Sequence, residues 1–211
     1  MNVRTQLFFI DGPAGKIECA LDLPEPEQFA APRGIALIAH PHPLYGGTMN
    51  NKIAQTLARA FVALGYAAAR LNFRGVGRSE GTYDEGHGET DDMAALLAHM
   101  QQRYPQVPVA LAGFSFGTFV QAQLQQRLTE RQAPAERLVL VGCAAGKWAM
   151  PPVPANTILI HGEHDDTIPL TDVLDWARPQ DLPVIVIPGA DHFFHRKLQH
   201  IKNFVVEMWH R

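Results

Sequence analysis

VPVALAGFSFG, residues 107–117, joins an apolar run to a Gly-x-Ser-x-Gly pattern. A short, continuous apolar run is typical of a strand that is covered on both faces of a sheet. The segment that follows, GTFVQAQLQQRLTER (117–131), predicts a helix. A Gly-x-Ser-x-Gly pattern between a strand and a helix indicates a sharp turn, which holds its serine, here Ser115, in a strained backbone conformation at the edge of the sheet.

Such a turn supplies what a nucleophilic serine needs. Gly113 and Gly117 leave room for the strand and the helix to approach each other closely. The N-terminus of the helix offers backbone N–H groups and the positive end of the helix dipole to an oxygen that becomes negatively charged. We therefore predict that Ser115 is a nucleophile and that the N–H of the next residue, Phe116, is one donor to an oxyanion.

The rest of the chain alternates between strand and helix patterns, which indicates an α/β protein. Residues 4–10 and 15–23 alternate apolar and polar side chains around DGPAG and predict an antiparallel hairpin. Apolar runs predict six further strands, and longer periodic segments predict helices on both faces of a mostly parallel, eight-stranded sheet. The strands are expected at 35–40, 66–73, 107–114, 137–144, 156–162 and 182–189, and helices at 51–65, 90–104, 117–131 and 170–178.

The predicted sheet limits where functional residues are expected to lie. Ligands of such sheets bind at the carboxyl ends of the parallel strands. Asp165 and Asp166 follow the strand expected at 156–162, and His192 follows the strand expected at 182–189. A serine nucleophile needs a base, and the base needs a carboxylate that orients it. Taken singly, His192 could be an exposed loop histidine and the two aspartates a helix cap.

Composition excludes several classes of protein. The 211 residues carry a formal net charge of −3 and no run of basic residues, which argues against nucleic-acid binding. The only cysteines, Cys19 and Cys143, make no disulfide framework or zinc spacing and are expected to be buried. No apolar run approaches the roughly 18 residues of a membrane span. The apolar run at 7–10 is too short for a signal peptide. We expect one domain over residues 1–211, in the cytoplasm and away from membranes.

Four motifs resemble those of the α/β-hydrolase fold family, in the family's order and over the chain from about Gly34 to the C-terminus. They are GFSFG (113–117), HGEHDDTIP (161–169), PGADHFF (188–194) and the Gly-rich loop LNFRGVGRSEG (71–81). The chain is most similar to small lidless members akin to dienelactone hydrolases and to prolyl-oligopeptidase-like catalytic domains. Members of that kind often carry an HPHP…GG loop, as at 40–47.

The resemblance implies a Ser-His-Asp triad of Ser115, His192 and Asp165, without a cofactor or a metal. In the family's acid motif the carboxylate stands three residues after the glycine and four before the proline. Gly162 and Pro169 then select Asp165 over Asp166. Lid domains of this fold are usually inserted after the sixth strand, where this chain has only AAGKWAMPPVPA (144–155). We expect an open site without a lid.

The loop HPHPLYGG (40–47) permits two interpretations. His40 and His42 could bind a metal together with His161, His164 and the neighbouring aspartates, but alternate residues of an extended segment point to opposite faces. No His-Glu-x-x-His pattern supports them. The alternative is an oxyanion loop: Pro41 and Pro43 have no N–H, which leaves His42 as the second donor beside Phe116. Matching the loop to related families also points to His42, with Leu44 as the fallback donor.

We therefore predict a serine hydrolase that cleaves a small-molecule substrate, a small or medium carboxylic ester or thioester. Alternatives are a dienelactone-hydrolase-like or peptidase-like activity and a non-catalytic hydrolase-like binding protein. Tyr45 and Phe193 are candidate substrate contacts, and Phe114, Phe116, Trp148 and Phe194 are further candidates for an apolar rim. Several of these rings could instead belong to the core, and at least one of Phe114 and Phe116, which flank Ser115, is expected to be buried. Arg74 and Arg78 could hold a substrate carboxylate or be structural, paired with nearby acids.

Overall fold

The computed structural model describes residues 5–210 and contains one eight-stranded sheet in the order β1-β2-β4-β3-β5-β6-β7-β8. β1 pairs antiparallel with β2, β2 pairs antiparallel with β4, and β3 to β8 run parallel. This arrangement confirms the predicted sheet with its N-terminal hairpin. Arg4, predicted as the first strand residue, lies outside the described residues. The strands are β1 Gln6–Gly12, β2 Gly15–Asp22, β3 Gly34–Ala39, β4 Tyr66–Leu71, β5 Val109–Phe114, β6 Arg137–Val141, β7 Ile158–Gly162 and β8 Val184–Ile187.

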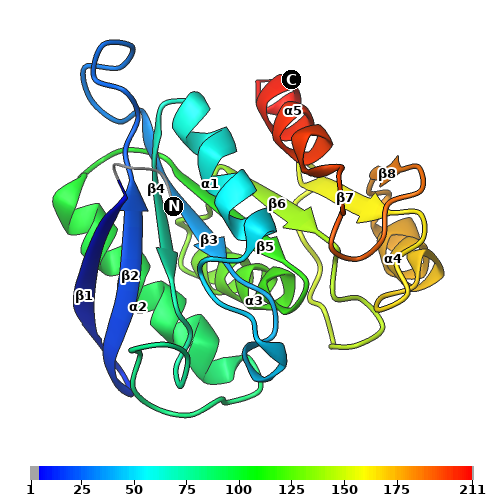
Figure 1. Cartoon of the computed structure of the whole chain (residues 1–211), viewed down its shortest axis with the longest axis horizontal. Helices are drawn as coiled ribbons and strands as arrows, with labels where there is room; N and C mark the ends of the chain where they lie inside the picture. The colour runs from blue at the N-terminus through cyan, green and yellow to red at the C-terminus, as the bar shows by residue number, and fades with distance from the viewer. Residues whose placement is uncertain (1–4, 211) are drawn as a thin grey trace.

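Helices cover both faces of the sheet. α1 and α5 pack on one face, and α2, α3 and α4 pack on the other, which makes two apolar cores (Figure 1). The helices are α1 Lys52–Ala63, α2 His87–Arg103, α3 Phe116–Glu130, α4 Leu170–Ala177 and α5 Leu198–Met208, with short 3-10 helices at Pro43–Tyr45 and Arg178–Gln180. No helix within residues 5–210 is long and apolar enough to cross a membrane.

The central strands are apolar throughout because both of their faces are covered. In β3, Leu37 faces the core under α2 and α3, whereas Ile38 faces the core under α1. All six residues of β3 and all six of β4 are buried. This explains why these strands read as continuous apolar runs in the sequence.

The prediction for the start of α2 was wrong. The helix begins at His87, three residues before the predicted start. Glu89 caps it, accepting hydrogen bonds from the N–H groups of Asp84 and Gly86. Asp92 therefore lies beyond the first turn, and its carboxylate binds Arg74.

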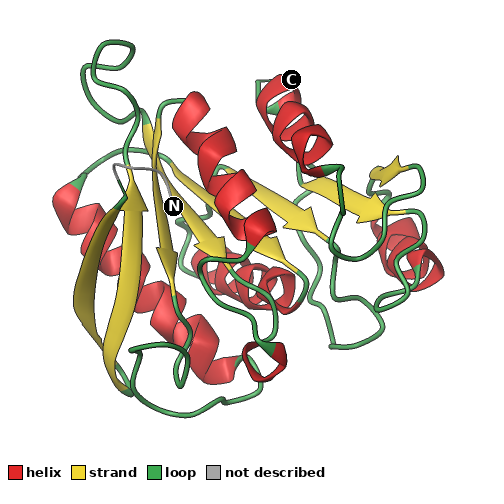
Figure 2. Ribbon diagram, viewed as in Figure 1, coloured by secondary structure: helices red, strands yellow, loops and turns green. Residues whose placement is uncertain are grey.

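The parallel strands end at one edge, where long loops gather (Figure 2). His40 follows β3, Ser115 follows β5, Asp165 follows β7 and His192 follows β8. Residues 142–157, between β6 and β7, form a loop with a single isolated bridge, Ala145–Trp148. The expected absence of a lid domain agrees with this connection.

Candidate active site

Ser115 occupies the sharp turn between β5 and α3. Its φ of 53° and ψ of −124° lie in a region that residues other than glycine rarely adopt. Its N–H donates to the carbonyl of Val141 at 3.0 Å, and its carbonyl accepts from the Thr118 hydroxyl at 2.6 Å. These bonds to β6 and to α3 hold the strained conformation in place.

Two glycines make the turn possible. A Cβ at Gly113 would stand 2.3 Å from the carbonyl oxygen of Gly117. A Cβ at Gly117 would stand 2.5 Å from the carbonyl oxygen of Ala39 and 2.7 Å from that of His40. The start of α3 therefore packs directly on the backbone that ends β3, and this contact brings the HPHP loop beside Ser115.

His192 joins Ser115 to Asp165. Its Nε2 lies 3.1 Å from the Ser115 Oγ, and its Nδ1 lies 2.7 Å from Oδ2 of Asp165. All three side chains are largely buried. The structure thus brings together three residues that were selected from three separate strand ends. A hydroxyl, an imidazole and a carboxylate in this order can pass a proton from the serine to the histidine.

Asp165 is held in its ionised form. Burial acts to raise the pKa of its carboxyl, but hydrogen bonds from His192 and from the Ile168 N–H more than offset this and leave the pKa lowered. Oδ1 also accepts from the N–H of Thr167 at 3.0 Å. Asp166 is exposed, and its carboxylate accepts from the Thr167 hydroxyl rather than from His192.

His161, which entered the sequence prediction only as a possible metal ligand, supports the loop that carries Asp165. It is a fully buried residue of β7 whose Nε2 lies 2.9 Å from the carbonyl oxygen of Ile168 and 3.5 Å from Oδ2 of Asp165. Burial lowers the pKa of its imidazole, so the ring is neutral and donates to that carbonyl. This contact closes the loop that carries Asp165.

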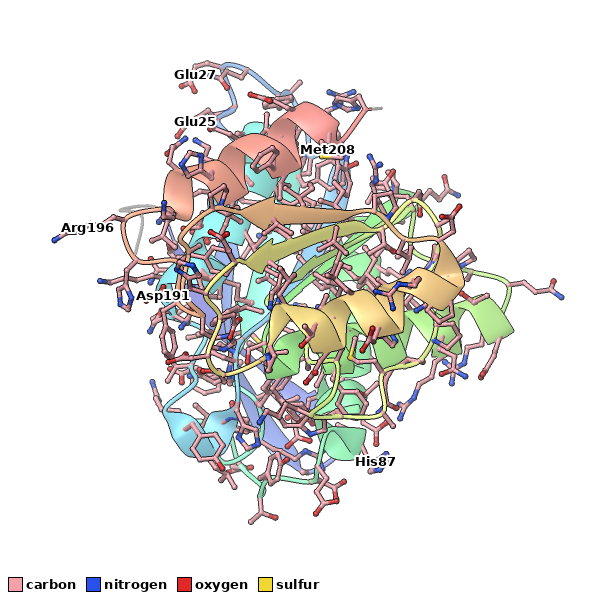
Figure 3. The ribbon with its side chains drawn as sticks, turned by 90° about the vertical axis from the view of Figure 1, so that its right-hand side faces the viewer. Glu25, Glu27, His87, Asp191, Arg196 and Met208 are labelled. Carbon is pink, nitrogen blue, oxygen red and sulfur yellow. The ribbon has the colours of Figure 1, made fainter. Side chains whose placement is uncertain are left out.

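The loop after β8 fixes His192. Asp191 accepts hydrogen bonds from the N–H of His195 and from its ring, and these bonds lower the pKa of the Asp191 carboxyl. Phe194, predicted at the apolar rim, is instead fully buried against α1 and α5, with a φ of 51°. Phe194 is therefore a core residue, and its place among the candidates for the rim was wrong. Asp191 and Arg196 lie on this loop, and Arg196 points away from the protein (Figure 3).

His40 is a structural residue at the end of β3. Its Nδ1 lies 2.6 Å from the carbonyl oxygen of Pro41, and its Nε2 accepts from the N–H of Phe73 at 3.0 Å. Burial lowers the pKa of His40 to about 3, against a smaller opposing effect of the bond to Pro41. The ring is therefore neutral, and both nitrogens are engaged by protein groups, which leaves no lone pair for a metal ion.

His42 lies in the same loop with its backbone N–H unengaged. Among the described residues no acceptor binds this N–H, whereas the N–H of Leu44 donates to Nδ1 of His42 at 3.2 Å. Leu44, the fallback donor, is thus already engaged. Phe116 is the first residue of α3, so its N–H has no acceptor within the helix. The rings of His42 and Phe116 pack with their centroids 4.9 Å apart, which places the two residues side by side.

The far end of this loop is anchored to β4. Met49 is fully buried; its N–H donates to Oδ1 of Asn72 at 2.9 Å, and its carbonyl accepts from the Arg70 guanidinium at 2.6 Å. Arg70 is itself buried and paired with Asp22. With the bond from Phe73 to His40, β4 and the residues after it hold both ends of the loop.

The candidate substrate contacts lie in different environments. The Tyr45 side chain is 87% exposed and packs on the His42 ring. Phe193 is 50% exposed beside His192. Phe114 and Phe116 are fully buried and cannot form a rim.

Arg74 pairs with Asp92 through two nitrogens at 2.8 and 3.0 Å and also lies 3.8 Å from Asp84. The Arg78 guanidinium lies over the Phe9 ring. These contacts favour the structural interpretation of both arginines. Tyr83, which packs on His42, was missed because it lies in the irregular segment between β4 and α2, which has no periodic pattern.

The metal interpretation of the HPHP loop finds no donor cluster. Within residues 5–210, no three histidine, cysteine, aspartate or glutamate side chains are grouped so that they could hold a metal ion. Cys19 and Cys143 are buried, and burial raises the pKa of each thiol to about 12. Neither thiol is therefore poised as a nucleophile.

Comparisons with known proteins agree with this geometry. A family model, Hydrolase_4, described as serine aminopeptidase, S33, matches residues 30–173, which is more than half of the chain. The crystal structure of XC6422 from Xanthomonas campestris, described as an α/β serine hydrolase without a lid, has a TM-score of 0.91 and 33% identity. That match covers 100% of this chain and 96% of the other.

Curated proteins are also similar to this chain in sequence. The uncharacterised protein RP471 of Rickettsia prowazekii is 33% identical over 95% of this chain and 86% of its own length. The lysophosphatidylserine lipase ABHD12 of Bos taurus is 34% identical over 74% of this chain, but the match spans only 34% of that protein.

The buried neutral His40 predicts a pH-dependent stability. Its pKa is about 3 in the folded protein and 6.5 when exposed, so between these values only the unfolded chain binds the proton and acidification favours unfolding. From pH 7 to pH 5 this group alone should lower the free energy of unfolding by about 2 kcal/mol. Urea denaturation of His40→Gln should show a pH dependence weaker by that amount. Equal pH dependences, at equal urea m-values, would contradict this assignment.

Proposed function

The chain belongs to the Hydrolase_4 family of α/β serine hydrolases, and we propose that it hydrolyses small or medium carboxylic esters or thioesters through an acyl-enzyme on Ser115. The observation that carries the proposal is the placement of His192, which contacts the Ser115 hydroxyl on one side and the Asp165 carboxylate on the other. No cofactor or metal ion takes part in the steps that follow.

In the first step the Ser115 Oγ attacks the carbonyl carbon of the ester while His192 Nε2 takes its proton across the 3.1 Å contact. The imidazole must have its proton on Nδ1 beforehand, so that Nε2 is free to accept. Asp165 fixes this tautomer, because its ionised Oδ2 accepts from Nδ1 at 2.7 Å. It also stabilises the imidazolium that the proton transfer creates.

The N–H groups of His42 and Phe116 stabilise the oxyanion of the tetrahedral intermediate. Phe116 contributes the N-terminus of α3, where the helix dipole favours negative charge. The N–H of His42 comes from a loop that is held at both ends, so this donor needs little movement when the oxyanion forms. The engaged N–H of Leu44 leaves His42 as the donor of choice.

Collapse of the intermediate releases the alcohol or thiol, which receives its proton from His192. Water then attacks the acyl-enzyme with His192 as the base, and the acid product leaves Ser115 free. Tyr45 and Phe193 flank the site as exposed apolar contacts for the substrate. Arg74 takes no part in binding, because Asp92 and Asp84 neutralise it. Uncharged esters are therefore favoured over dienelactone-like carboxylates.

Replacing the two adjacent aspartates should separate catalytic from structural effects. Asp165→Asn removes the anionic partner of His192 and should lower kcat for p-nitrophenyl acetate by about 10³–10⁴-fold. Asp166→Asn, the matched control, should stay within about threefold of wild type because Asp166 does not contact His192. Ser115→Ala gives the rate of hydrolysis that does not depend on the nucleophile. Treatment with EDTA should leave the wild-type rate unchanged. Equal losses in both aspartate variants, or loss with EDTA, would contradict the mechanism.

The backbone donor at His42 can be tested by a proline substitution. The φ of His42 is −52°, within the range that proline adopts, so His42→Pro removes the N–H while preserving this φ. It should lower kcat by about 10²–10³-fold. His42→Ala keeps the N–H and loses only the imidazole, so it should retain activity within about tenfold. Equal rates in the two variants would argue against His42 as a donor.

A further inference from the structure

A group of aromatic rings surrounds the His42 imidazole. Ring centroids of Tyr45, Tyr83, Phe116 and Trp148 lie 4.7, 5.0, 4.9 and 5.6 Å from that of His42. Phe116 is fully buried, whereas His42, Tyr83 and Trp148 are half-buried. We call the rings of His42, Tyr83 and Trp148 the aromatic platform. A cluster that only supported the core would be covered, but the platform retains accessible surface.

The reaction chemistry indicates which part of a substrate meets the platform. His192 must give a proton to the leaving-group oxygen, so that oxygen lies near Nε2 of His192. The rings that pack against His192 are Phe114 and Phe193, and no ring of the platform does so. The leaving group therefore lies on the Phe193 side.

The acyl group of the substrate lies on the side of Ser115 that faces away from His192. The carbonyl oxygen is held by the N–H groups of His42 and Phe116, whose own rings belong to the platform or support it. The substituent on the carbonyl carbon that points away from His192 then lies toward Tyr83 and Trp148. Because these residues lie in the loops after β4 and β6, they approach the site from elements other than those that carry the triad.

The platform is uncharged at neutral pH. Burial lowers the pKa of the His42 imidazole and raises the pKa of the Tyr83 phenol, so both rings are neutral. Arg74, which lies between β4 and α2 as Tyr83 does, is paired with the Asp92 carboxylate, so its positive charge is balanced. The Tyr83 and Trp148 rings are tilted by 39° and 38° from the His42 ring, so the three form a shallow, uncharged aromatic surface. Such a surface favours an aromatic group, which can pack on these rings, over a carboxylate-bearing chain.

We propose that the aromatic platform is the acyl-binding subsite and that the preferred substrates are uncharged esters of aryl carboxylic acids. The proposal rests on the hydrolase function proposed above and adds the acyl specificity to it. Trp148, the largest ring of the platform, is its main determinant.

Two esters with the same leaving group test the proposal: p-nitrophenyl benzoate and p-nitrophenyl acetate. Trp148→Ala should lower kcat/KM for the benzoate by about tenfold or more, because a ring contact is lost. It should change kcat/KM for the acetate by less than about threefold, which also shows that the variant is folded. Trp148→Phe should restore most of the benzoate activity. Phe193→Ala, the matched control on the leaving-group side, should change kcat/KM for both esters by the same factor.

The outcomes separate the subsite from the function on which it rests. The acyl subsite is overturned if Trp148→Ala lowers kcat/KM for both esters by the same factor, or leaves kcat/KM for the benzoate unchanged. In either case Ser115-dependent hydrolysis of the acetate shows that the hydrolase function stands. If wild-type protein shows no Ser115-dependent hydrolysis of either ester, the proposed function itself fails, and the subsite fails with it.

Discussion

The backbone contact between Gly117 and the last carbonyls of β3 is the constraint on which the site depends. A side chain at residue 117 would collide with the carbonyl oxygens of Ala39 and His40, so only glycine lets α3 begin there. Because of this contact, the N-terminus of α3 and the HPHP loop lie at one point of the sheet edge. Ser115 lies at the turn between β5 and α3, and the rings of His42 and Phe116, from the HPHP loop and from α3, pack together at this point.

The HPHP loop owes its shape to buried polar groups rather than to its own hydrogen bonds alone. His40 contacts the N–H of Phe73, and Arg70 and Asn72 hold the carbonyl and N–H of Met49. Each of these groups is buried, where an unmade hydrogen bond would cost about 1–3 kcal/mol. The loop therefore has little freedom to leave this conformation. Stabilising charge in a transition state requires donors that are fixed beforehand, and this anchoring would provide that for the donor proposed at His42.

Much of the fold could be predicted because the central strands are buried on both faces. That burial makes the sequence of β3, β5 and β6 apolar without interruption. The Gly-x-Ser-x-Gly pattern indicated Ser115, and the rule that parallel strands carry ligands at their carboxyl ends added His192 and the pair Asp165 and Asp166. The resemblance to a family motif then favoured Asp165, and in the structure His192 contacts both Asp165 and Ser115. Strand ends were less predictable: β4 stops at Leu71, and the N–H of Phe73 donates to the His40 ring rather than to a neighbouring strand.

Features that depend on tertiary contacts could not be predicted from local pattern. The pairing of Arg74 with Asp92 joins a loop to a helix 18 residues away. Tyr83 has no periodic neighbours, and only the folded loop places it on His42. Phe194 is buried and has a positive φ, and no glycine at this position signals such a backbone conformation.

The most direct measurement is mass spectrometry of the folded protein after treatment with a fluorophosphonate, which reacts covalently with activated serines. One adduct is expected, on the peptide that contains Ser115, and none in Ser115→Ala. Folded wild-type protein without an adduct, or with the adduct on another residue, would contradict the assignment of Ser115 as the nucleophile.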